Sequence, residues 1–259
     1  RRRHPVCRRT RARWAFRRSR RRRRLIEGAP IMCLVAWNFA MALHRKLLAL
    51  APDLAVISEC AHPNIIAARL AGPPPWRQAI WVGGNCQKGL GVFAFGDTSI
   101  DMSRRRHDSA LRLIAPVAVS GPLPFHLLAG WAQNANDGFR RKDQLGPVSH
   151  ALRRYRRFMA AASCLLAGDF NNNVIWDRPG WPMNHAAHVA TLARRGLVSL
   201  YHSRSGEADG RETTPTHYWR DRRIDGPTYH IDYIFMPEAW LPRGAALRSA
   251  VFMIGAAMD

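Results

Sequence analysis

The chain has 259 residues, 47% of them hydrophobic, and a formal net charge of +22. This length and apolar content suit one large α/β domain with a core, or two small domains. No apolar run reaches the roughly 18 residues that a membrane-spanning helix needs. Five cysteines without any Cys-x-x-Cys spacing argue against a disulfide framework or a zinc site. Because a signal-peptide core is also missing, we expect a cytoplasmic protein.

The N-terminal segment, residues 1–29, holds fourteen arginines and one acidic residue, Glu27, so it carries +13 of the charge. Such a segment cannot bury a core and is predicted to be a disordered tail. It is interpreted as an arm for nucleic acid or another anionic surface, as a targeting arm, or as sequence that is not native. Residues 30–259 are predicted to form one domain.

Apolar runs that end in polar or turn-forming residues dominate the first half of this domain. Runs of this kind predict short, buried strands. The predicted strands span 31–37, 52–60, 79–82, 89–95, 111–119 and 125–131, and a short helix spans 43–50. The strands 79–82 and 89–95 are expected to pair around the turn between them.

Helical and extended patterns alternate in the second half. Apolar residues recur at helical spacing over 148–159 with arginines between them, which predicts an amphipathic surface helix. A buried strand is predicted to run into Asp169, a second helix spans 186–195, and the last clear strand spans 229–236. Many strands with few helices between them favour two packed sheets with helices outside.

The strand that runs into Asp169 stops abruptly at a cluster of amides. Residues i and i+2 of an extended segment point the same way, so we expect Asp169 and Asn171 to face a common point and Phe170 to turn into the core. A carboxylate can take a proton or a hard cation, and an amide can bond a phosphate oxygen.

Two other apolar strands also end in polar residues, Asn38 and Glu59, and the last strand carries His230 and Asp232. Strand ends form the mouth of the ligand crevice in layered α/β folds. Carboxylates and amides without a Cys/His cluster favour Mg²⁺, with Mn²⁺ as an alternative. Such a set suits phosphoester hydrolysis, in which a metal polarises the phosphoryl group and a carboxylate takes a proton from water.

The segment from Ile31 to about Trp240 resembles the endonuclease/exonuclease/phosphatase superfamily, the fold of DNase I and of the exonuclease III type abasic-site nucleases. The resemblance implies an α/β fold, a DNase I-like four-layer sandwich of two packed mixed β-sheets flanked by helices. It rests on four motifs in this order: Trp37-Asn38, Pro52-Asp53 through Ser58-Glu59, Gly168-Asp169-Phe170-Asn171, and Ile231-Asp232-Tyr233.

The resemblance also implies a role for each matched residue. Glu59 would be the principal metal ligand, with Asn38 beside it in contact with metal and substrate. Asp169 would align or deprotonate the attacking water, and Asn171 would bond the scissile phosphate. Asp232 would orient a catalytic His.

The sequence departs from the family in two places. The family usually has a His or Tyr where this chain has Trp131, whose indole cannot accept a proton; Asn134 is taken as a substitute substrate-binding residue. After Trp240 the chain contains no Ser-Asp-His, so we expect the last strand to be missing and Asp232 to lack its His. His230 is retained as a substrate-binding candidate, although nothing in the sequence brings it to that position.

These residues predict a monomeric, Mg²⁺-dependent phosphoester hydrolase, a nuclease or phosphodiesterase whose activity is reduced by the loss of Ser-Asp-His. The basic body of the chain favours nucleic acid as the substrate. The alternative is a catalytically inactive nucleic-acid-binding protein of the same fold. A third possibility is a fragment that does not fold stably.

Overall fold

The computed structural model describes residues 32–38, 45–102, 107–132, 146–181, 183–218, 226–243 and 248–251. The predicted tail, residues 1–29, and the predicted substrate-binding residue Asn134 lie outside these ranges. No helix in the described ranges is long and apolar enough to cross a membrane.

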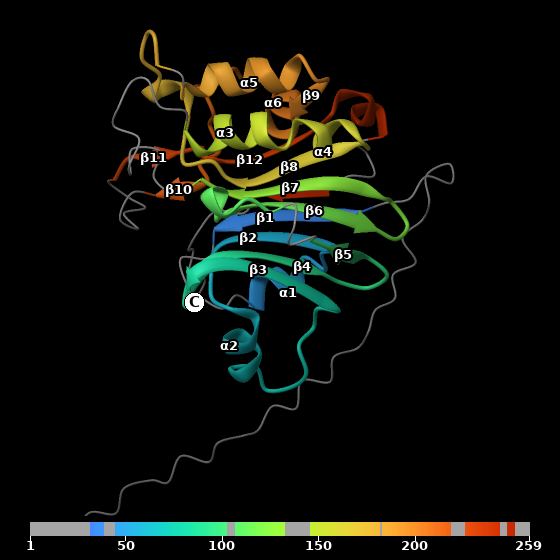
Figure 1. Ribbon diagram of the computed structural model, residues 1–259. Helices are drawn as coiled ribbons and strands as arrows, with labels where there is room; N and C mark the ends of the chain where they lie inside the picture. The colour runs from blue at the N-terminus through green and yellow to red at the C-terminus, as the bar shows by residue number, and fades with distance from the viewer. Residues whose placement is uncertain are drawn as a thin grey trace, which may run out of the picture.

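Two mixed β-sheets lie face to face, and helices cover their outer faces (Figure 1). The first sheet has the strand order β13-β1-β2-β4-β3. Its strands are β1 Cys33–Asn38, β2 Leu54–Cys60, β3 Gln78–Asn85, β4 Lys88–Ala94 and β13 Arg248–Val251. Strands β1 and β2 are parallel, whereas β4 runs antiparallel to both of its neighbours.

The second sheet has the order β5-β6-β7-β8-β12-β9. Its strands are β5 Ser99–Asp101, β6 Ile114–Ser120, β7 Phe125–Trp131, β8 Cys164–Asp169, β9 Leu197–Ser199 and β12 Asp232–Pro237. Strand β8 runs parallel to β7 and antiparallel to β12. A small ribbon of β10 (His217–Tyr218) and β11 (Thr228–Tyr229) stands at one end.

The helices divide between the two outer faces. Helices α1 (Arg45–Ala49) and α2 (Pro63–Ala68) lie on the side of the first sheet. The second sheet is covered by α3 Pro147–Arg154, α4 Arg156–Ala160, α5 His185–Ala193 and α6 Leu200–Ser205. The architecture is therefore the predicted four-layer sandwich.

The core has three apolar layers because most strands are apolar on both faces. Side chains such as Val56, Val92 and Leu127 fill the space between the sheets. Smaller clusters fill the spaces beneath the helices, around Leu192 on one side and Trp37 on the other. Continuous apolar runs in the sequence were the correct signal for these buried strands.

Several elements differ from the sequence-based expectations. The helix predicted over 148–159 is divided at Tyr155 into α3 and α4. Helix α2 and strand β13 were not predicted, and β13 pairs in parallel with β1 at the outer edge of the first sheet. The last strand was expected to be missing after Trp240, and this expectation is wrong, because β13 follows Trp240 and occupies the edge of the sheet beside β1.

Candidate active site

Residues from both sheets meet at one edge of the sandwich. Asn38, at the end of β1, donates a hydrogen bond from Nδ2 to Oδ2 of Asp169, at the end of β8, over 3.0 Å. Asp232, at the start of β12, lies directly opposite Asp169 in the antiparallel register. All three side chains are buried. The edge therefore joins an amide from one sheet to two carboxylates from the other.

Gly168 makes the approach of β8 to its neighbour possible. Its φ of +137° belongs to a region that L side chains rarely adopt, and an added Cβ would lie 1.9 Å from the carbonyl oxygen of Gly130. Strands β7 and β8 thus meet through a pair of glycines in register. Because Asp169 comes next in the chain, this close pairing fixes the place of its carboxylate.

Asn171 reaches the site through a turn. Its φ is +45°, and its backbone N–H donates to Oδ1 of Asp169 over 2.8 Å. The extended geometry predicted for this residue is therefore wrong: the strand ends at Asp169, and the carboxylate bonds the following backbone as in an Asx turn. Phe170 does turn into the core, where its ring stacks on Phe235 at 5.7 Å.

Glu59 lies on β2 at a break in the pairing with β4. The register shifts between Ile57 and Cys60, and Glu59 has a φ of +53°. A β-bulge with a positive φ turns the side chain away from its regular direction in the strand. Backbone strain of this kind is concentrated at functional sites. Oε2 of Glu59 lies 3.0 Å from Nζ of Lys88.

Lys88 connects Glu59 to the second sheet. Its Nζ lies 5.3 Å from the ring centroid of Trp131, which faces Asp169 in the parallel register of β7 and β8. The indole nitrogen of Trp131 is buried and has no hydrogen-bond partner among the described residues. Glu59 and Asp169 therefore belong to the same edge of the molecule.

The carboxyl groups at this edge are held in an environment that disfavours their charge. Burial, and then the charge of Glu59, raise the pKa of Asp169 to about 7, although hydrogen bonds from Asn171 and Asn38 lower it. Burial and the charge of Asp169 raise the pKa of Asp232 well above its usual range. Buried like charges are stable only with a proton or a compensating cation.

The donor atoms at this edge fit a hard divalent cation. They are carboxylate and amide oxygens, the ligands that Mg²⁺ prefers. One of them, Oδ1 of Asp232, is buried and lacks a hydrogen-bond partner among the described residues. A cation near these groups would offset the charge that burial leaves uncompensated.

His230 lies apart from this group. It is buried, with Nδ1 2.8 Å from the carbonyl oxygen of Thr214 and its ring 4.3 Å from that of Tyr201. The strand is interrupted between β11 and β12. There Oγ1 of Thr216 accepts hydrogen bonds from the backbone N–H groups of Ile231 and Asp232. Because of this break, the spacing of two residues did not bring His230 to the side of Asp232.

Two residues at this edge escaped the sequence-based search, Lys88 and Thr216. Lys88 could have been found from an antiparallel pairing of 89–95 with 52–60. Such a pairing places the start of the first strand beside the end of the second, where Glu59 lies. Thr216 carried no signal, since a hydroxyl that accepts from two backbone N–H groups depends on a fold across fourteen intervening residues.

No protein-family model and no curated protein matches the chain. Solved structures do match it. The 3'-5' exonuclease NExo from Neisseria meningitidis has a TM-score of 0.54 at 17% identity, over 81% of this chain and 87% of that one. The AP endonuclease LMAP from Leishmania major has a TM-score of 0.55 at 13% identity, over 80% and 78% of the two chains.

A third match is the endonuclease domain of TRAS1, a telomere-specific non-LTR retrotransposon. It has a TM-score of 0.53 at 16% identity, over 82% of this chain and 88% of that one. Identities this low show a shared fold, and they say nothing by themselves about activity.

Proposed function

We propose that this chain, whose fold is the DNase I-like fold of the endonuclease/exonuclease/phosphatase superfamily, is a Mg²⁺-dependent phosphoester hydrolase that cleaves nucleic acid. The observation that carries the proposal is the hydrogen bond between Asn38 and Asp169, which joins the two sheets at an edge that Glu59 and Asp232 share. This clustering of oxygen donors at strand ends is what phosphoester hydrolysis with a hard metal requires.

Each residue at the edge receives one task. Glu59 and Asn38 would hold the Mg²⁺ ion, which when bound polarises a phosphoryl oxygen. Asp169, oriented by Asn38 and by the N–H of Asn171, accepts the proton of the attacking water. The Asn171 amide donates to an oxygen of the scissile phosphate. Asp232 places a second carboxyl group beside Asp169.

Lys88 supplies the positive charge closest to Glu59 in the described contacts. Its ammonium group is held between the carboxylate of Glu59 and the ring face of Trp131. A cation in this position can attract a phosphate group to an edge that is otherwise rich in carboxylates.

Nucleic acid is the substrate class that the charge supports. Residues outside 1–29 carry +9 in total. Exposed arginines occupy α3 and α4 at positions 153, 154, 156 and 157. A structure of similar fold, the 3' phosphatase NExo from Neisseria, is described as bound to a product DNA hairpin. A basic surface neutralises the phosphates of such a polymer.

A cleavage assay tests the proposal. Single- and double-stranded oligonucleotides are incubated with the full chain in Mg²⁺, in Mn²⁺ and in EDTA. We expect cleavage with either metal, none in EDTA, and a loss of about 10²-fold to 10⁴-fold on Glu59→Gln. The matched control is Asp101→Asn, an exposed carboxyl on β5, which should retain wild-type activity.

A specific observation favours a second candidate, a catalytically inactive nucleic-acid-binding protein. Oδ1 of Asp232 has no hydrogen-bond partner among the described residues, so no described histidine bonds this oxygen. If wild type binds oligonucleotides with an affinity that falls steeply with salt, yet cleaves none in any metal, this second function replaces the first.

A further inference from the structure

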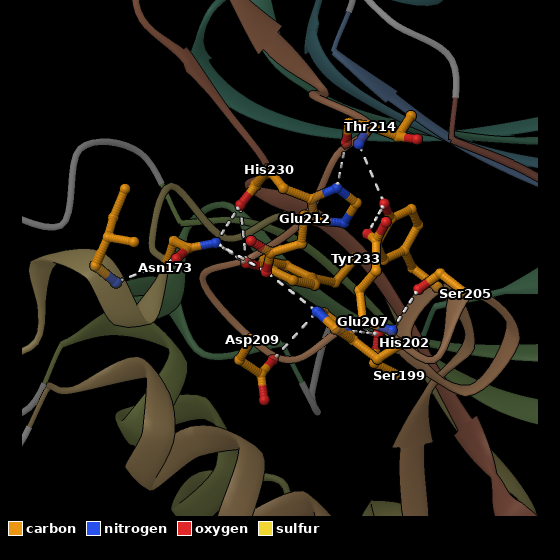
Figure 2. Close-up of polar contacts among 12 residues, drawn as sticks. Asn173, Ser199, His202, Ser205, Glu207, Asp209, Glu212, Thr214, His230 and Tyr233 are labelled. Atoms are coloured by element: carbon orange, nitrogen blue, oxygen red, sulfur yellow. Dashed lines mark hydrogen bonds and ion pairs between the residues drawn. The ribbon is translucent and has the colours of Figure 1, made fainter.

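The edge that carries Asn38, Glu59, Asp169 and Asp232 is called the catalytic edge below. A second polar cluster lies apart from it, between the second sheet and α6. His202 of α6 faces two carboxylates from the loop that follows the helix (Figure 2). Its Nε2 lies 3.1 Å from Oε1 of Glu212 and 3.4 Å from Oδ1 of Asp209. The three atoms that could serve as ligands all lie within 4.8 Å of one another.

We propose that His202, Asp209 and Glu212 form a binding site for a first-row transition metal ion such as Zn²⁺, separate from the catalytic edge. Ligand atoms about 2.1 Å from an ion lie roughly 3.0 to 3.5 Å apart on a tetrahedron or an octahedron. The two distances from Nε2 fall in this range. One imidazole nitrogen with two carboxylates suits Zn²⁺ better than Mg²⁺ or Ca²⁺, which prefer oxygen alone.

The outer contacts of the cluster hold the ligands in place. Nδ1 of His202 lies 2.8 Å from Oγ of Ser199. When the imidazole donates through Nδ1, its Nε2 lone pair is left for an ion, as is usual for metal-bound histidines. Oε1 of Glu212 accepts from Nδ2 of Asn173 over 3.1 Å. Asn173 is itself buried and also bonds the hydroxyl of Tyr233.

The loop that carries the carboxylates is closed on itself. Helix α6 ends at Gly206, whose φ is +72°. Glu207 then bonds both the backbone N–H and the hydroxyl of Thr213, at 3.0 and 2.6 Å. This closure sets Asp209 and Glu212 over His202. The Asp209 side chain is 34% exposed, so an ion can enter from solvent and keep water ligands.

An unpartnered group stands next to the cluster. His230 is only 3% exposed, its Nε2 has no hydrogen-bond partner among the described residues, and its ring centroid lies 6.0 Å from that of His202. Figure 2 shows it on the side of Glu212. A water bound to an ion at the cluster would give Nε2 of His230 the partner that the protein does not supply.

The proposed ion would act as a clamp. Asn173, which donates a hydrogen bond to Glu212, lies in the same short segment of the chain as Asp169 and Asn171. A metal at His202 would therefore tie the loop 206–213 to the segment that carries the catalytic groups. This proposal does not depend on the activity of the catalytic edge, and it is tested without an activity assay.

Zinc titration calorimetry tests the site in the Glu59→Gln background, which removes the principal ligand of the catalytic edge. We expect one Zn²⁺ per chain and a melting temperature that rises with Zn²⁺. Asp209→Asn should weaken this binding more than tenfold and abolish the rise in melting temperature. The matched control, Asp101→Asn, should change neither.

A second variant guards against a folding defect. Glu212→Gln should also weaken Zn²⁺ binding more than tenfold, and circular dichroism without metal shows whether each variant is folded. Equal Zn²⁺ affinity in the parent and in folded Asp209→Asn and Glu212→Gln variants would overturn the proposal. His202 and the two carboxylates would then form a hydrogen-bonded ion pair only.

Discussion

The proposed catalytic edge and the His202 cluster both contain buried carboxyl groups, but their surroundings shift the pKa of these groups in opposite directions. At the edge, burial and the charge of Glu59 raise the pKa of Asp169 to about 7. In the cluster, burial would raise the pKa of Glu212, yet hydrogen bonds from His202, from backbone N–H groups and from Asn173 lower it to about 2. Asp169 lies near the charge of Glu59, whereas Glu212 accepts hydrogen bonds from a histidine, an amide and backbone N–H groups, so the surroundings favour the neutral form of the first carboxyl group and the charged form of the second.

The largest effect is expected on cleavage, when the carboxyl group of Asp169 is replaced. Asp169→Asn keeps the size of the side chain but removes its ability to accept a proton, so cleavage should fall about 10²-fold to 10⁴-fold. Cleavage rates under single-turnover conditions measure this loss. If the variant cleaves at the wild-type rate, Asp169 is not the base and the edge is not the catalytic centre.

The geometry of the edge is tested by Gly168→Ala. A Cβ 1.9 Å from the carbonyl of Gly130, at a φ of +137°, should lower the free energy of unfolding by about 3 kcal/mol or more. Urea unfolding measures it. The control is Gly206→Ala, which also has positive φ but open space around it, and should lose only about 1 kcal/mol. Equal losses would show that β7 and β8 do not approach closely.

A pair of isosteric substitutions compares the two regions directly. Asp232→Asn replaces a buried carboxyl group whose ionised form is disfavoured by burial and by the charge of Asp169, so it should raise the free energy of unfolding by about 1 kcal/mol at pH 8 without metal. Glu212→Gln removes a charge that accepts several hydrogen bonds, so it should lower that energy by about 1 to 3 kcal/mol. Changes of the same sign in both variants would remove the distinction drawn between the regions.

Much of the fold followed from the sequence because it depends on local pattern. Continuous apolar runs marked the buried strands, and their polar ends marked Asn38, Glu59 and Asp169. Features that depend on contacts between distant segments did not follow. The bulge at Glu59 arises from its pairing with β4, and the pairing of Lys88 with Glu59 spans 29 positions.

The helix over 148–159 and the His202 cluster were not predicted correctly for similar reasons. The helix over 148–159 breaks because Tyr155 ends one helix and begins the next, and its hydroxyl accepts from the N–H of Asp108 in a distant loop. The pattern of apolar residues continues across that break. The His202 cluster could not be predicted either, since the order His, Asp, Glu in a loop carries no signal until the loop closes.

A further effect concerns acid stability, through two buried histidines of α5. Burial lowers the pKa of His185 to about 3 and that of His188 to about 4, and the charge of His188 also lowers that of His185. The folded state binds fewer protons than the unfolded one, so stability is full above pH 6.5 and is lost as the pH falls toward 4. At pH 5.5 each histidine should cost about 1.4 kcal/mol.

Chemical unfolding between pH 8 and 5 measures this slope. In His188→Gln, which can still bond Ser149, the loss between pH 7 and 5.5 should shrink by about half. An unchanged slope would mean that the proton uptake belongs to other groups.

The central claim is that Glu59 and Asn38 of the first sheet hold one divalent ion at the edge where Asp169 of the second sheet meets them. Crystals of the full chain grown with Mn²⁺ test it most directly through anomalous scattering. We predict a peak about 2.2 Å from a carboxylate oxygen of Glu59, with Lys88 displaced from that oxygen. A fully occupied Mn²⁺ peak elsewhere, with Glu59 still paired to Lys88, would contradict the account.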